Sequence, residues 1–146
     1  MTLTEKNYIN EINSYAIESW LPLFKLIEKI EKETSFGGLV DSRRIAENLV
    51  TIPFWSKAEL VKEYIKILYQ IPIIINFDWM LWQEGINILN DETYNFDNLD
   101  VPTKCKLLTT VVRSDRYCDG ALIQAFDSGQ IQNIVFSIAN GFRYDV

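Results

Sequence analysis

Residues 107–138 read LLTTVVRSDRYCDGALIQAFDSGQIQNIVFSI, and we expect this stretch to organise the fold. Apolar residues recur at helical spacing on both sides of a charged centre, over Leu107–Val112 and again over Leu122–Phe126. A third apolar run, Ile131–Ile138, follows Ser128-Gly129. Because glycine is common where helices stop and start, the stretch predicts three helices joined by two short turns.

The rest of the chain also favours helices, because apolar residues recur at steps of three or four in most segments. The sequence therefore predicts an all-α protein. We expect a compact single-domain bundle of seven or eight short helices over residues 1–146, with little or no strand. The helices outside the quoted stretch are expected within residues 5–33 (two helices with a bend near Pro22), 41–50, 56–68, 78–89 and 100–112.

Two local signals refine this prediction. Ser56-Lys57-Ala58-Glu59 has the pattern of a capping box, in which Ser56 caps a helix and Glu59 reaches back to the cap. Ile71–Ile75 is rich in β-branched residues, and Pro72 prevents a continued helix. One isolated strand cannot pair its edges, so we expect a buried extended connection there and no sheet.

Composition excludes several classes of function. The chain has 146 residues and a net charge of −6, without a dense run of Lys or Arg, so we expect no nucleic-acid partner. It has no histidine, which removes Ser-His-Asp and Cys-His catalytic sites and the commonest metal ligand. We expect no cofactor and no metal, and the assignment as an enzyme stays uncertain but is disfavoured.

The two cysteines, Cys105 and Cys118, form no metal-binding motif and are expected to be reduced thiols. The N-terminal residues are too polar for a signal peptide, and the apolar runs are too short to span a bilayer. We therefore expect a cytoplasmic protein without a membrane partner.

The charged cluster, Arg113–Gly120, is the most specific feature of the sequence and has two interpretations. In the favoured structural one, Arg116 pairs with Asp119, or Arg113 pairs with a carboxylate from another helix, and Asp119 caps the helix that follows. In the alternative, Arg113 and Arg116 clamp a phosphate or carboxylate, while Asp115 and Asp119 act as base and acid or hold a divalent cation. Tyr117 belongs to the same candidate site.

A second candidate site is the aromatic pair Trp79 and Trp82, which is expected on one face of a helix capped by Asp78. The two indoles could stack on a base or on another flat ligand. Aromatic residues at this spacing more often belong to the core, and we favour that interpretation.

These motifs also carry a resemblance. The run Phe77-Asp78-Trp79 with Trp82, and the run from Arg113 through Arg116-Tyr117 to Asp119-Gly120, are similar to a family of small uncharacterised bacterial proteins known only as a domain of unknown function. The resemblance covers roughly Trp20–Ile138. It implies a compact helical domain, but it supplies no activity, cofactor or partner.

Two hypotheses for the function follow from the residues. The favoured one is a non-enzymatic protein-interaction or regulatory accessory module, because an acidic, aromatic-rich helical domain suits contact with a protein partner or with itself. The alternative is a domain that binds a small anionic molecule or a nucleotide, with or without hydrolysing it, through Arg113, Asp115, Arg116 and Asp119.

Overall fold

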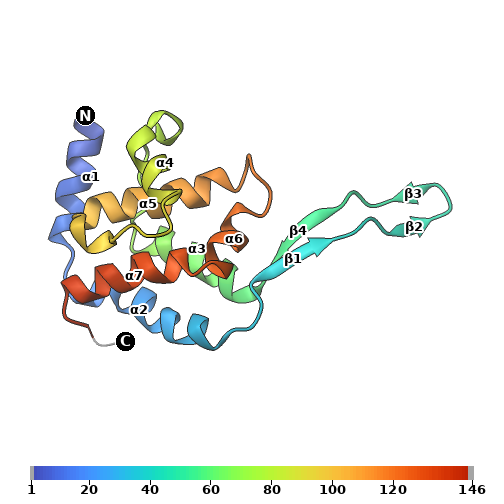
Figure 1. Cartoon of the computed structure of the whole chain (residues 1–146), viewed down its shortest axis with the longest axis horizontal. Coiled ribbons are helices and arrows are strands. Elements are labelled where there is room, and N and C mark those ends of the chain that lie inside the picture. The colour runs from blue at the N-terminus through green and yellow to red at the C-terminus, as the bar shows by residue number, and fades with distance from the viewer. Residues whose placement is uncertain (1, 145–146) are drawn as a thin grey trace.

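The computed structural model describes residues 2–144 and places most of them in a helical body from which one β-hairpin projects (Figure 1). About 60% of the residues are helical and 9% are in strands. The α-helices of the described chain are α1 (Leu3–Ser14), α2 (Ile17–Lys32), α3 (Glu59–Gln70), α4 (Gln83–Leu89), α5 (Val101–Ser114), α6 (Ala121–Asp127) and α7 (Gln130–Gly141). Two short 3₁₀ helices are η1 (Trp79–Leu81) and η2 (Phe96–Asn98).

Helix α5 lies at the centre of the body, where it packs against α1, α4, α6 and α7. It is a strong helix because the Asp100 side chain accepts a hydrogen bond from the Thr103 N–H at 2.9 Å, and Pro102 occupies the first turn. Helices α2 and α3 close the opposite side around Trp20 and Tyr64, which are both fully buried. Burial of these large aromatic side chains supplies much of the hydrophobic stabilisation of the body.

The predicted order of three helices over residues 107–138 is confirmed. Gly120 and Gly129 precede α6 and α7, and both have left-handed backbone angles, with φ of +82° and +80°. A residue with a side chain adopts this conformation only at a cost, so glycine at these positions permits the two tight turns.

The segment Ile73–Ile75 is also buried without helix or strand, as expected, and the Ile75 N–H donates to the Thr109 hydroxyl.

The all-α prediction is wrong, because residues 37–57 form an antiparallel hairpin where a helix was expected within 41–50. Strand β1 (Gly37–Val40) pairs with β4 (Phe54–Lys57), and farther out β2 (Arg44–Ala46) pairs with β3 (Leu49–Val50). The expected helix rested on the spacing of Ile45, Ala46, Leu49 and Val50, which short apolar runs cannot assign uniquely to helix or strand. The β-branched residues of this segment favour the extended form.

Two smaller predictions are also wrong. Ser56 lies in β4 and caps no helix, because α3 begins after Ala58, which offers no side-chain acceptor. Asp78 forms no capping hydrogen bond, and only the single turn η1 follows it before α4 begins at Gln83. Within residues 2–144, no helix combines the length and the apolar character needed to cross a bilayer.

Candidate functional site

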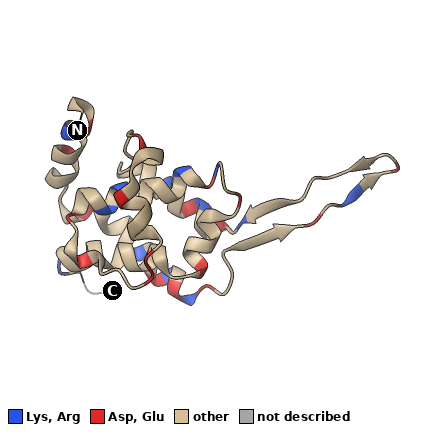
Figure 2. Cartoon of the chain, turned by 45° about the horizontal axis from the view of Figure 1, so that its top comes forward, with Lys and Arg blue, Asp and Glu red and all other residues tan. Residues whose placement is uncertain are grey.

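The hairpin of residues 37–57, called the arm below, extends away from the helices and carries an unusual amount of exposed apolar surface (Figure 1). Ile52 is 83% exposed, and Phe54 at the edge of β4 is 50% exposed. The arm also carries both cationic and acidic residues, which Figure 2 marks in blue and red. The large apolar side chains exposed on the arm are Leu39, Ile45, Leu49, Val50, Ile52 and Phe54.

The distal half of the arm is held by few internal contacts. Between the two short sheets, pairing is maintained by Thr51, whose N–H donates to the Arg43 carbonyl at 2.8 Å and whose hydroxyl accepts from the Arg43 N–H at 2.7 Å. Pro53 lacks an N–H and interrupts the ladder. Beyond this point every residue from Asp41 to Val50 is exposed, so both faces and both edges of the distal hairpin meet solvent.

The proximal half of the arm, by contrast, is fixed to the turn between α5 and α6. The Trp55 ring lies against Gly120 so closely that a Cβ at Gly120 would sit 2.5 Å from the indole. Immediately before the arm, the ring of Phe36 stacks on Phe126 of α6, with centroids 5.2 Å apart. These contacts set the direction in which the arm leaves the body.

Asp115 is the carboxylate that joins the arm to this turn. It lies 2.9 Å from the Lys57 Nζ of β4, and its other oxygen accepts a hydrogen bond from the Leu122 N–H at 3.0 Å. Asp115 therefore satisfies a donor in the first turn of α6 and neutralises a cation at the base of the arm at the same time.

The predicted ion pair between Arg116 and Asp119 is wrong. Both residues are exposed, and the ion pairs among residues 2–144 are Lys57 with Asp115 and Lys62 with Glu59. Asp119 also caps nothing, because Gly120 occupies the N-cap of α6 without a side-chain hydrogen bond. The spacing favours Asp119, whereas the structure uses Asp115, because spacing along one chain segment cannot reveal a partner on a distant strand.

The structure brings part of the charged cluster together in a cavity of about 240 Å³ at the base of the arm. The cavity is lined by Lys57, Arg113, Asp115 and Arg116, and apolar side chains complete its wall. Tyr117 and Asp119, which were predicted in the same site, do not line it. Because Asp115 is already engaged by Lys57 and the Leu122 N–H, the cavity carries two arginines without an ion-pair partner in the described chain.

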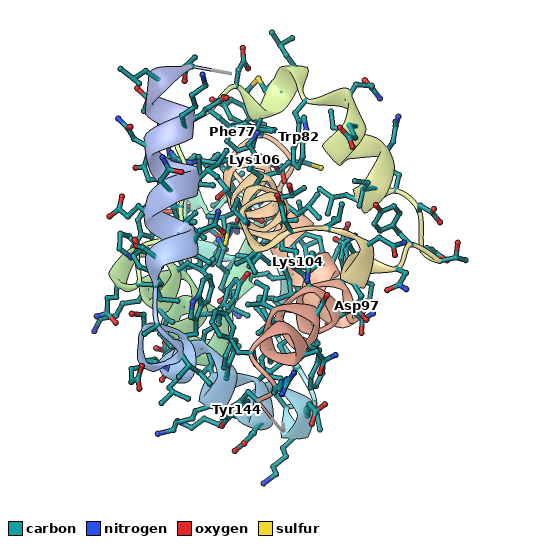
Figure 3. The ribbon with its side chains drawn as sticks, turned by 90° about the vertical axis from the view of Figure 1, so that its left-hand side faces the viewer. Phe77, Trp82, Asp97, Lys104, Lys106 and Tyr144 are labelled. Atoms are coloured by element: carbon teal, nitrogen blue, oxygen red, sulfur yellow. The ribbon has the colours of Figure 1, made fainter. Side chains whose placement is uncertain are left out.

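The aromatic pair does not form the predicted helical face. Trp82 packs edge to face on Phe77, with the ring centroids 5.6 Å apart. The Lys106 Nζ lies over both rings, 4.9 Å from the Phe77 centroid and 5.3 Å from the Trp82 centroid (Figure 3). Trp79 lies in η1, and its ring centroid is 5.9 Å from that of Tyr117. Both tryptophans are half-buried, so their surroundings fit a packing role better than a stacking platform.

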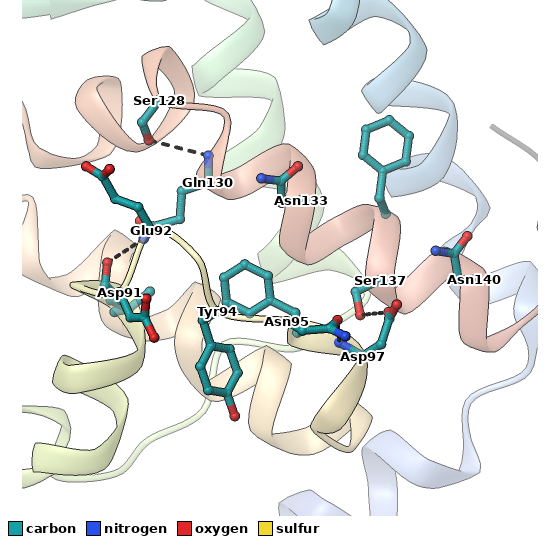
Figure 4. Close-up of a pocket in the computed structure, with 13 residues that line it drawn as sticks. Asp91, Glu92, Tyr94, Asn95, Asp97, Ser128, Gln130, Asn133, Ser137 and Asn140 are labelled. Atoms are coloured by element: carbon teal, nitrogen blue, oxygen red, sulfur yellow. Dashed lines mark hydrogen bonds between the residues drawn. The ribbon is translucent and has the colours of Figure 1, made fainter.

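A second cavity, of about 570 Å³, lies between α7 and the segment before α5 and was not expected (Figure 4). Its wall carries the carboxylates Asp91, Glu92 and Asp97 and no Lys or Arg. A signal was available in the sequence, because the polar residues of α7 recur at steps of three and four on one helical face. Those residues are Gln130, Asn133, Ser137 and Asn140.

Ser137 connects this cavity to a buried lysine. Its hydroxyl donates to Asp97, and its carbonyl accepts from the Lys104 Nζ at 3.3 Å (Figures 3 and 4). Burial lowers the pKa of Lys104, while the negative charges of Asp97 and Asp100 partly oppose that shift. The amine therefore joins α5 to α7 through the Ser137 carbonyl.

No cluster of three or more Cys, Asp or Glu side chains suited to a metal ion occurs in the described part of the chain. Comparison with curated proteins and with solved structures finds no match for the chain. The model of a family of unknown function (DUF6508) matches residues 16–143, so the resemblance to an uncharacterised family is confirmed and the chain belongs to DUF6508.

Proposed function

We propose that this protein is a non-enzymatic interaction module and that the arm is the element that contacts its partner. The observation that supports this most strongly is the apolar surface of a hairpin that projects into solvent. Exposed apolar side chains in such number on one segment mark an interaction surface. Unpaired strand edges are in addition a template for pairing with another chain.

The energetics favour covering the arm. Burial of one large aliphatic or aromatic side chain contributes about 1.5–3 kcal/mol, and the arm presents six such side chains. The base of the arm is already ordered by Trp55 and by the ion pair of Lys57 with Asp115. A partner therefore meets a hairpin whose direction is set in advance, which reduces the entropy lost on binding.

Site-specific photo-crosslinking in the native host tests this proposal. A photoreactive residue at Ile52 on the arm should give a discrete crosslinked product, because this side chain is the most exposed of the apolar set. The matched control is the same photoreactive residue at Glu18 of α2, an exposed helical position 19 residues before the arm begins. Equal crosslinking at both positions, or none at Ile52, would overturn the proposal.

A second candidate function has one observation in its favour. The 240 Å³ cavity gathers Lys57, Arg113 and Arg116 around the single carboxylate Asp115, an excess of positive charge in an otherwise acidic chain. Paired guanidinium groups suit a phosphate or carboxylate group of a ligand. Because Asp115 is held by two partners, the arrangement supports anion binding and gives no free base for hydrolysis.

Calorimetric titration with inorganic phosphate tests this second function. Millimolar binding that Arg116→Gln abolishes, and that Lys25→Gln on an exposed face of α2 leaves intact, would support an anion site. Absence of heat for the wild-type protein, or equal binding by the Arg116→Gln variant, would exclude phosphate as a ligand of this cavity.

A further inference from the structure

We propose that the partner of the arm is a second copy of this chain, joined arm to arm about a twofold axis. This inference rests on the proposed function, since it names the partner of the same surface. A twofold interface uses the same patch on both subunits, so that patch has to be complementary to itself. The distal arm has this property in its charges and in its apolar residues.

The charges of the distal arm balance within the arm. Residues 41–53 contain the two cations Arg43 and Arg44 and the two carboxylates Asp41 and Glu47, so their net charge is zero. All four side chains are exposed, and none of them forms an ion pair among the described residues. Two arms that meet antiparallel can therefore pair the cations of one copy with the carboxylates of the other.

The rest of the molecule disfavours other modes of self-association. The whole chain carries −6, and the neutral distal arm leaves this entire charge on the remaining residues. Two such bodies in direct contact would repel each other, whereas arms that project from them meet at a distance. Figure 2 shows that the arm projects away from the helical body, which carries the remaining net charge of the chain.

The backbone of the distal arm also lacks partners that a second arm supplies. Strands β2 and β3 contain three and two residues, and a two-stranded hairpin of this size is marginally stable alone in water. Each strand has one unpaired edge. Pairing of two arms edge to edge extends the sheet to four strands and places apolar side chains of the two copies, such as Ile45 or Leu49, beside one another on its faces.

Charge exchange between two variants tests the proposal with purified full-length protein. R43E/R44E changes the distal arm from zero to a net −4, and D41K/E47K changes it to +4. In sedimentation velocity, the wild-type protein should show a species of twice 17.0 kDa at micromolar concentration. Each variant alone should be monomeric because like charges meet, and a 1:1 mixture of the two variants should restore the dimer.

The possible outcomes separate this inference from the proposed function. A monomeric wild-type protein at every concentration, or variants that both remain dimeric alone, overturns the arm-to-arm dimer. The photo-crosslink at Ile52 then decides the rest, because a product with a mass other than twice the chain keeps the interaction module and rejects self-association. Circular dichroism of both variants should match the wild type, since the four substituted side chains are exposed and lie outside the core.

Discussion

Replacing Asp115 should destabilise the protein far more than replacing Asp119, although both carboxylates lie in the same turn. Asp115→Ala removes the acceptor of the Leu122 N–H in the first turn of α6, a contribution of about 1 kcal/mol for a helix cap. It also removes the partner of Lys57. The side chains of that pair are 29% and 13% exposed, so we assign it about 0.5–1 kcal/mol.

The combined loss for Asp115→Ala is about 1.5–2 kcal/mol. For a domain of this size, that corresponds to a fall in melting temperature of roughly 5–8 °C. Lys57→Ala should cost about 0.5–1 kcal/mol, since only the ion pair is lost. The double variant should cost less than the sum of the two single variants, because both remove the same interaction.

Thermal and urea unfolding followed by circular dichroism measures these differences. Asp119→Ala is the matched control, and its free energy of unfolding should change by less than about 0.5 kcal/mol because the exposed carboxylate has no partner in the described chain. If Asp119→Ala lowers the melting temperature as much as Asp115→Ala, the assignment of the structural carboxylate is wrong.

Three further predictions test the turns, the core and the arm. Gly120→Ala should lower the melting temperature more than Gly129→Ala. Both positions have positive φ, but only at Gly120 would the new Cβ meet the Trp55 ring, at 2.5 Å. Equal losses of melting temperature would contradict this packing. Burial raises the pKa of the Cys105 thiol above its ordinary 9.0, so the unfolded chain releases this proton first and stability should fall as the pH rises above about 9. The fall should be shallower in Cys105→Ala by up to about 1.4 kcal/mol per pH unit, and parallel pH curves for the two proteins would refute the assignment. Ile52→Ser should change the free energy of unfolding by less than about 0.5 kcal/mol, and a larger loss would mean that the arm supports the fold of the monomer.

The sequence predicts the helical body well because the apolar faces of its helices point into one core. Helix α5 is the clearest case, since Asp100, Pro102 and the apolar run up to Val112 all indicate the same element. The mostly helical character and the three helices over residues 107–138 are accordingly confirmed.

The arm escaped prediction for a physical reason. A strand that packs against a core alternates apolar and polar residues, and this alternation is the signal that identifies it. The distal arm is exposed on both faces, so no alternation is imposed on Ile45, Leu49 or Val50, and their spacing also suits a helix. The β-branched residues and the Gly37-Gly38 pair were the remaining hints of a hairpin.

The candidate site was predicted in part. Arg113, Asp115 and Arg116 do line one cavity, but Lys57, which completes it, lies 58 positions before Asp115 and carries no local sign of this role. The polar face of α7 was readable from the sequence, whereas the opposing carboxylates come from an irregular segment before α5 whose position depends on tertiary packing.

The arm is an insertion between α2 and α3 whose two ends lie side by side. Its two ends, Gly37 and Lys57, are directly paired. Just outside this pair, the Ala58 N–H donates a hydrogen bond to the Phe36 carbonyl. A change in the number of residues between the paired ends therefore alters the reach of the hairpin and leaves the connection between α2 and α3 unchanged. A short turn in place of residues 41–53 should therefore yield the helical body with the contact of Trp55 and Gly120 intact.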